Sequence, residues 1–198
     1  MMAQFPNFEG QVADTFISRE DGVVKWEYWN VLGYSKVNPI VEYDLVQTRD
    51  GRISYWRLFY FPRFLGYLGT PVDNTLVEKY ATAWSSGDPK IVSALYAPDG
   101  VREDTLFGNT STDRNTVEGF AADFFAWYPG VKFELLEPFS EQTPGVMKGA
   151  IYAIHVNDGS GTLCDVRVAV LLDPSKNGIK KENIYYNAES LIGCGWAR

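Results

Sequence analysis

Residues 77–108, VEKYATAWSSGDPKIVSALYAPDGVREDTLFG, constrain the fold more than any other part of the chain. Apolar residues recur there at helical spacing up to Trp84, and a Ser-Ser-Gly break then ends the helix. Asp88 is a candidate N-cap for a second, shorter helix that begins with proline. The strand that follows carries Arg102 and Asp104. Two helices set at an angle and followed by such a strand would wall the mouth of a curved sheet, which predicts a pocket.

The overall composition predicts an ordered globular protein and excludes several function classes. With 198 residues and 45% hydrophobic side chains, the chain can bury the core of one large domain or two small ones. A net charge of −7 argues against a nucleic-acid-binding surface and against docking on anionic membranes. No apolar run reaches the roughly 20 residues that are needed to cross a bilayer.

The N-terminus and the cysteines together indicate a cellular compartment. The first residues have no basic region followed by a long apolar segment, so we expect no secretion signal and a cytoplasmic protein. In that reducing compartment Cys164 and Cys194 are expected to be free thiols, which we favour over the alternative of a disulfide. One histidine and two cysteines do not make a metal-ligand set, and no glycine loop for phosphate is present. We therefore expect neither a metal nor a cofactor.

Two parts of the chain share a rhythm of strands and turns. Asp-Gly and Asn-Asp-Gly turns separate apolar, alternating segments in both parts, which is typical of antiparallel sheets with one buried face. The first part predicts strands at residues 12–18, 23–31, 40–48 and 53–61. The second part predicts strands at residues 132–136, 146–156, 162–172 and 179–188. The chain thus contains a strand unit and a second copy of it.

Only the second copy has helices ahead of its strands. Helical periodicity and stop signals predict helices at residues 73–85, 89–96 and 116–128. Residues 62–72 are interpreted as a connection with room for a short helical turn. This organisation predicts a partial unit at residues 1–65 and a complete unit at residues 66–198.

The complete unit resembles the nuclear-transport-factor-2-like superfamily, in particular its SnoaL-like polyketide cyclase and ketosteroid isomerase branches. The resemblance covers residues 72–192 and rests on matching short motifs: Tyr80 with Trp84, Ser86-Gly87-Asp88, Leu95-Tyr96-Ala97-Pro98-Asp99, Glu103-Asp104, Phe107-Gly108 and Gly178-Ile179. It implies an α+β fold, a cystatin-like cone of curved antiparallel sheet closed by three N-terminal helices. Residues 12–65 resemble the strand half of the same fold, which implies an extra antiparallel meander ahead of the cone.

The resemblance also implies roles for individual residues. Asp104 stands where the isomerase branch keeps its general base, and Tyr80 where that branch keeps an oxyanion-stabilising hydroxyl. The position of a second oxyanion donor falls on Val168, which cannot donate. The SnoaL-like cyclases pair an aspartate with a histidine, and the sole histidine here is His155. Arg102 with Asp104 resembles the arrangement in the epoxide hydrolase branch, although the sequence does not identify a second carboxylate.

These residues predict a candidate site, and each has a structural alternative. Asp104 can instead pair with Arg102, Tyr80 can be a core aromatic, and His155 can face solvent. We predict Asp104, Tyr80 and His155 as catalytic, and as substrate-binding residues Trp84, Arg102, Phe107, Phe124, Trp127 and Val168. An apolar lining of this kind suits an apolar, ring-shaped ligand. The predicted function is acid–base chemistry of the isomerase, cyclase or dehydratase type, and the alternative is a non-catalytic ligand-binding or assembly module.

The partial unit has no helices of its own to cover its sheet. We therefore expect it to pack on the outer face of the second sheet, as an intrachain pseudo-dimer, with a homodimer as the alternative. Its remaining apolar face would be covered by a second subunit or by four aromatic residues: Phe5, Phe8, Phe64 and Tyr67.

Overall fold

The computed structural model describes residues 9–17, 21–29, 36, 39–60, 74–104, 106–140, 147–157 and 163–194, and within them ten strands form one sheet. The N-terminal meander consists of β1 (Glu9–Ile17), β2 (Asp21–Trp29), β3 (Ile40–Arg49) and β4 (Arg52–Tyr60). The other strands are β5 (Tyr96–Asp104), β6 (Asn109–Ser111), β7 (Lys132–Ser140), β8 (Lys148–Asn157), β9 (Leu163–Ser175) and β10 (Gly178–Tyr186). The eight strands predicted from alternation and turns are all present, with shifted ends.

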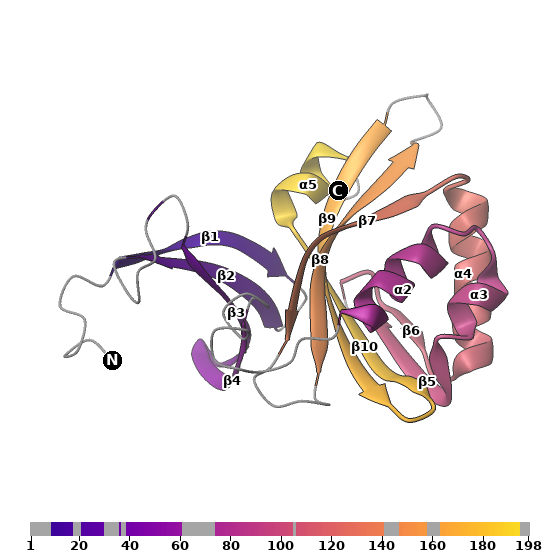
Figure 1. The fold of residues 1–198 in the computed structure, drawn as a ribbon, viewed down its shortest axis with the longest axis horizontal. Helices are drawn as coiled ribbons and strands as arrows, with labels where there is room; N and C mark the ends of the chain where they lie inside the picture. The colour runs from indigo at the N-terminus through magenta and orange to yellow at the C-terminus, as the bar shows by residue number, and fades with distance from the viewer. Residues whose placement is uncertain are drawn as a thin grey trace.

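The strand order is β1-β2-β3-β4-β7-β8-β9-β10-β5-β6, and β1 also pairs with β10. The meander therefore meets the second group of strands at two seams. At one seam Ile17 is the register partner of Tyr186, and at the other Tyr60 is the partner of Ser140. Figure 1 shows the meander on one side of the curved strands β7 to β10 and the helices α2, α3 and α4 on the other.

Three helices precede or interrupt the strands of the second unit, as predicted: α2 (Thr75–Trp84), α3 (Pro89–Ser93) and α4 (Arg114–Trp127). Gly87, whose φ is 73°, turns the chain between α2 and α3 in a conformation that a side chain would oppose. Asp88 caps α3 by accepting a hydrogen bond from the backbone N–H of Lys90. Asp113 and Thr116 form a capping box at the start of α4.

Two hydrophobic cores lie on opposite faces of the same strands. Because side chains alternate along a strand, Val168 and Val170 face the helices whereas Ala169 and Leu171 face the meander. The first core joins α2, α3 and α4 to the inner face of the sheet. The second joins the meander to the outer face and contains Phe16, Val23, Tyr43, Leu45, Phe59, Phe139, Ile151, Ala169, Leu171 and Tyr185. The meander thus covers the outer face within one chain.

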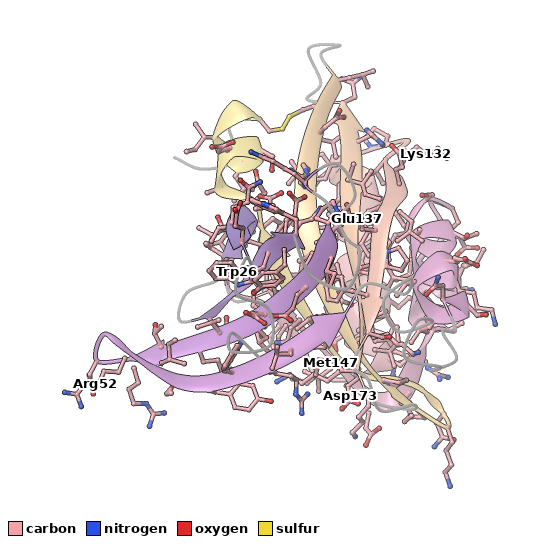
Figure 2. All side chains as sticks on the ribbon, turned by 60° about the vertical axis from the view of Figure 1, so that its left-hand side comes forward. Trp26, Arg52, Lys132, Glu137, Met147 and Asp173 are labelled. Carbon is pink, nitrogen blue, oxygen red and sulfur yellow. A yellow bond between two sulfur atoms is a disulfide. The ribbon has the colours of Figure 1, made fainter. Side chains whose placement is uncertain are left out.

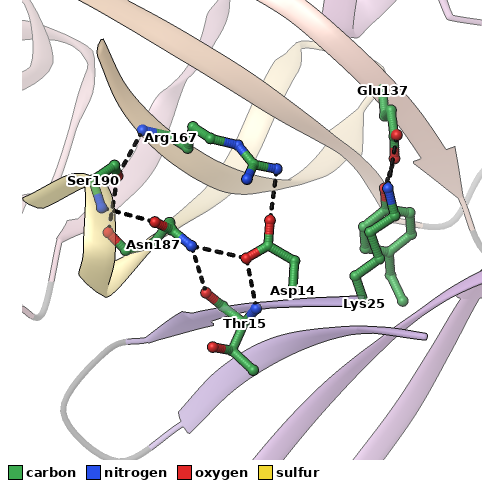
Figure 3. Close-up of polar contacts among 8 residues, drawn as sticks. Asp14, Thr15, Lys25, Glu137, Arg167, Asn187 and Ser190 are labelled. Carbon is green, nitrogen blue, oxygen red and sulfur yellow. Dashed lines mark hydrogen bonds and ion pairs between the residues drawn. The ribbon is translucent and has the colours of Figure 1, made fainter. Parts of the chain in front are cut away.

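Polar contacts reinforce the seam between β1 and the second unit (Figure 3). Arg167 Nη2 lies 2.6 Å from Asp14 Oδ2, and the Asn187 side-chain amide donates to Asp14 Oδ1 at 2.8 Å. Asn187 also caps α5 (Ala188–Gly193) by accepting from the Ser190 backbone N–H. These contacts connect β1 to β9 and to the end of β10.

The structure corrects the prediction of free thiols. Cys164 on β9 and Cys194 at the end of α5 form a disulfide with a Cα–Cα distance of 5.6 Å, visible as the yellow bond in Figure 2. The cause is α5, which the sequence did not predict and which lies against β9. The short strand β6 was also not predicted. The connection at 62–72 and the residues Phe5, Phe8, Phe64 and Tyr67 lie outside the described residues, and the division of the chain at residue 65 stays a prediction. No helix in the described part of the chain is long and apolar enough to span a membrane.

Candidate functional site

A cavity of about 440 Å³ lies between the helices α2 and α4 and the inner face of the sheet. Aromatic and aliphatic side chains make up most of its wall, and a few polar groups lie among them. The lining residues are Tyr80, Trp84, Arg102, Asp104, Phe107, Asn109, Phe120, Phe124, Trp127, Tyr128, Phe133, Ile154, Ile184 and Tyr186. Apolar walls with few polar groups are typical of small-molecule sites.

Most of the predicted site residues meet in this cavity. The set comprises Tyr80, Trp84, Arg102, Asp104, Phe107, Phe124 and Trp127. Phe107 and Trp127 are 42% and 63% exposed, so they lie at the mouth, whereas Asp104 and Trp84 are buried. The roles assigned to these residues from the family resemblance stay predictions.

The structure does not bring His155 or Val168 to the cavity wall. Ile154 lines the cavity, and because neighbouring side chains on a strand point to opposite faces, His155 lies on the outer face of β8. Its Nδ1 is 2.7 Å from Asp165 Oδ1 and its Nε2 is 3.0 Å from Glu134 Oε2. These hydrogen bonds, that to Asp165 foremost, raise the pKa of His155. Val168 is buried in the inner core.

Asp104 is only 2% exposed, and three groups contact its carboxyl oxygens. The Tyr186 hydroxyl donates to its Oδ2, and the Phe107 backbone N–H donates to its Oδ1 at 3.2 Å. Arg102 Nη2 lies 3.7 Å from Oδ2, which is an ion pair rather than a hydrogen bond. Both oxygens of the carboxylate are therefore engaged.

Arg102 is a buried cation between two carboxylates. Its Nε lies 3.4 Å from Glu182 Oε1, and its guanidinium stacks 4.0 Å from the centre of the Phe120 ring. A second aromatic contact, at 5.7 Å, is with Trp84. Within the described residues, Arg102 Nη1 is buried and has no hydrogen-bond partner. Such groups are expected to find an acceptor, either a ligand oxygen or an ordered water.

Glu182 is the functional candidate that the sequence analysis missed. It is fully buried, and it accepts hydrogen bonds from Tyr80 Oη at 2.9 Å and from Tyr96 Oη on its other oxygen. Burial raises the pKa of Glu182, against the opposing charge of Arg102. A signal was present: Glu182, Ile184 and Tyr186 share one face of β10, so an acid stands in an inward, otherwise apolar row.

The tyrosine hydroxyls of the site stay protonated over the ordinary pH range. Burial, and then the charge of Glu182, raises the pKa of Tyr80 well above its usual value. Burial, and then Asp104, does the same for Tyr186. Tyr80 already donates a hydrogen bond to Glu182, so in this structure its hydroxyl is engaged by the buried acid. Among the residues described, no three or more His, Cys, Asp or Glu side chains are grouped to hold a metal ion.

The arrangement of the sheet and helices is similar to that of known domains. Residues 77–173 match the model of the SnoaL-like domain family. The chain is similar to a Catenulispora acidiphila protein with a ketosteroid isomerase-like fold, solved in complex with trimethylamine. The two are 25% identical, the match covers 64% of this chain and 100% of the other, and the TM-score is 0.53.

Two more distant similarities establish the fold alone. One is to a Shewanella putrefaciens protein named after the SnoaL-like polyketide cyclases, at 12% identity over 69% of this chain and 93% of the other, with a TM-score of 0.53. The other is to SalBIII, described as an epoxide hydrolase/cyclase-like enzyme in pyran ring formation in polyether salinomycin, at 13% identity over 58% and 90%, with a TM-score of 0.51.

The matched region is a SnoaL-like domain with the α+β fold of the ketosteroid isomerase-like and nuclear-transport-factor-2-like proteins. This confirms the resemblance and the fold class predicted from the sequence. No curated protein matches the chain.

Proposed function

We propose that the cavity binds an apolar small molecule and transfers a proton on it, with Asp104 as the general base. The observation that carries the proposal is a buried carboxylate in the wall of an otherwise largely aromatic cavity of about 440 Å³. A carboxylate in such surroundings can remove a proton from a carbon next to a carbonyl and return it elsewhere on the ligand. This is chemistry of the isomerase, cyclase or dehydratase type, and the apolar wall suits a cyclic substrate.

An unused donor in the cavity wall supports the proposal. Arg102 Nη1 lacks a partner within the described residues, so we expect the ligand to place an oxygen near it. An Arg102 donor would stabilise negative charge that develops on that oxygen during proton removal. In this arrangement Tyr80 donates a hydrogen bond to Glu182, and Glu182 in turn forms an ion pair with Arg102.

The first experiment finds a ligand and then follows the proton. A thermal-shift screen against steroids, polyketides and terpenoid epoxides identifies compounds that stabilise the protein. A ketone among them is then incubated with the protein in D₂O. Mass spectrometry measures deuterium uptake at the carbon next to its carbonyl. We expect Asp104→Asn to slow uptake by roughly 10²-fold or more. The matched control is Asp99→Asn, because Asp99 lies exposed on the same strand and pairs with Lys180.

Two results would contradict this function. Full deuterium uptake by Asp104→Asn would remove Asp104 as the base. Binding without any uptake by the parent protein would leave the alternative, a non-catalytic ligand-binding module.

A second candidate function is the opening of an epoxide. The observation that favours it is Arg102 lying between two carboxylates, of which Asp104 lines the cavity and Glu182 is buried behind it. Asp104 would take a proton from the attacking water and return it to the epoxide oxygen once its C–O bond has broken. Incubation in ¹⁸O-labelled water tests this: incorporation of one ¹⁸O per diol supports it, and an unchanged epoxide excludes it.

A further inference from the structure

Tyr186, the last residue of β10, connects the candidate base to the mouth of the cavity. The residue lines the cavity and is buried, and its hydroxyl donates to Asp104 Oδ2. Neighbouring Tyr185 points to the opposite face, where it belongs to the outer core and donates to Asp21 at 3.3 Å. Each of these two adjacent buried tyrosines thus donates to an aspartate, and only Tyr186 reaches the site.

The turn between β5 and β6 holds Asp104 and Tyr186 together. The Phe107 backbone N–H donates to Asp104 Oδ1, while the Phe107 ring packs edge-on against Tyr186, at 5.1 Å between centroids and 90° between planes. The phenol and the amide therefore engage different oxygens of one carboxylate. A carboxylate restrained at both oxygens is confined to one side-chain orientation.

The contacts of Tyr186, Phe107 and Arg102 with the Asp104 carboxyl group differ in their distances. Arg102 Nη2, at 3.7 Å from Oδ2, is too far for a hydrogen bond, whereas the Tyr186 hydroxyl is in hydrogen-bond contact with the same oxygen. Arg102 is in addition shared with Glu182. Orientation at Oδ2 therefore depends on the phenol more than on the guanidinium.

We propose that Tyr186 is the positioning residue for Asp104: its hydroxyl holds the carboxyl group in the orientation in which it faces the cavity. This inference rests on the proposed function of Asp104 as a base. Tyr186 takes the place beside the aspartate that the sequence analysis gave to His155, which lies on the other face of the sheet. The raised pKa of Tyr186 keeps the phenol protonated and therefore a hydrogen-bond donor.

The first test needs no substrate. In the full chain, hydrogen exchange of the Phe107 amide, followed by NMR, reports whether Asp104 Oδ1 still accepts its hydrogen bond. Tyr186→Phe frees the Asp104 carboxylate to rotate and so weakens the hydrogen bond from the Phe107 amide. We expect the protection of this amide to fall by up to about tenfold, which corresponds to the loss of one hydrogen bond. The matched control Tyr185→Phe removes a similar hydroxyl on the other face and should leave the Phe107 amide unchanged.

The second test uses the deuterium-uptake reaction. Tyr186→Phe should lower kcat and leave KM nearly unchanged. A loss of packing alone would not separate kcat from KM in this way. If Tyr186→Phe does not fold, Phe107→Ala removes the ring that supports Tyr186 at a half-exposed position, and the amide of residue 107 is measured in the same way.

The outcomes separate this inference from the proposed function. A Phe107 amide that stays equally protected in Tyr186→Phe overturns the positioning role, even if Asp104→Asn abolishes uptake. Lost protection without uptake by the parent protein keeps the positioning contact and removes the reaction. Equal loss of protection in both tyrosine variants also overturns the inference, because the effect would then be a general loss of stability.

Discussion

Individual carboxylates that are wholly or partly buried in this molecule have very different surroundings. Glu182 has two tyrosine donors and a cation, whereas Glu42 on β3 has a weak contact with Tyr28 and the nearby acid Asp44. Burial, and then the charge of Asp44, raises the pKa of Glu42 from 4.5 to about 7. The folded protein therefore holds a proton there that the unfolded chain has released, so stability falls as the pH rises from about 4.5 to 7.

We accordingly expect Glu42→Gln to flatten the dependence of stability on pH in that window. Above pH 7 the variant should be more stable than the parent by about 1 kcal/mol, allowing for the partial exposure of the side chain. Urea unfolding at a series of pH values measures this. Glu27→Gln, on the neighbouring strand of the same meander, is the control. A variant that keeps the slope of the parent would contradict the assignment to Glu42.

At the scale of elements, the helix α5 joins the parts of the molecule. It is capped by Asn187, which also binds Asp14 on β1, and its end is linked to β9 through the Cys164–Cys194 disulfide. The disulfide closes a loop across a sequence separation of 30, so reduction should lower the free energy of unfolding by roughly 2–4 kcal/mol. Urea unfolding with and without a reducing agent measures the difference.

The double variant Cys164→Ser, Cys194→Ser is the control for this prediction. Its free energy of unfolding should be lower than that of the oxidised parent and should not change when the reducing agent is added. Hydrogen exchange should rise in α5 before it rises in β8, because α5 has few other contacts. Equal stability of the parent with and without reductant would show that the link contributes nothing.

At the scale of the whole molecule, the N-terminal meander packs on the outer face of the sheet. Figure 2 shows the meander lying across that face, with the β3–β4 hairpin extending away from the body and Arg52 near its tip. Deletion of residues 1–65 would expose the outer-core side chains Phe139, Ile151, Ala169, Leu171 and Tyr185. We expect the remainder to aggregate or to dimerise through this face, measured by light scattering after size exclusion. A well-behaved monomer would contradict the pseudo-dimer proposal.

Much of the fold could be predicted because its signals are local. The break after Trp84, the cap at Asp88 and the alternation along β9 each depend on residues close in the sequence. The inward row of β10 was equally readable, yet Glu182 was not identified. A single acid in a strand does not reveal its partners, since Tyr80, Tyr96 and Arg102 lie at least 80 positions earlier in the chain.

His155 shows the limit of assigning a role from residue type. As the sole histidine it is the natural acid–base group near neutral pH. The face of the sheet on which it lies depends on which residues of β8 point inward, and the tertiary structure shows that the neighbouring Ile154 does. His155 therefore points outward, where it contacts Asp165 and Glu134 on the two adjacent strands.

By itself the sequence determined most of the strands and helices, although not β6 and α5, because hydrophobic period and turn chemistry act over a few residues. Its short motifs also indicated the SnoaL-like resemblance that the match of residues 77–173 confirms. The tertiary structure alone decided three other features: the two seams that join the meander to the sheet, the disulfide, and the cluster of Asp104, Arg102, Glu182 and Tyr186. Each of these depends on the register between distant strands, which is set by how whole faces pack rather than by any local pattern.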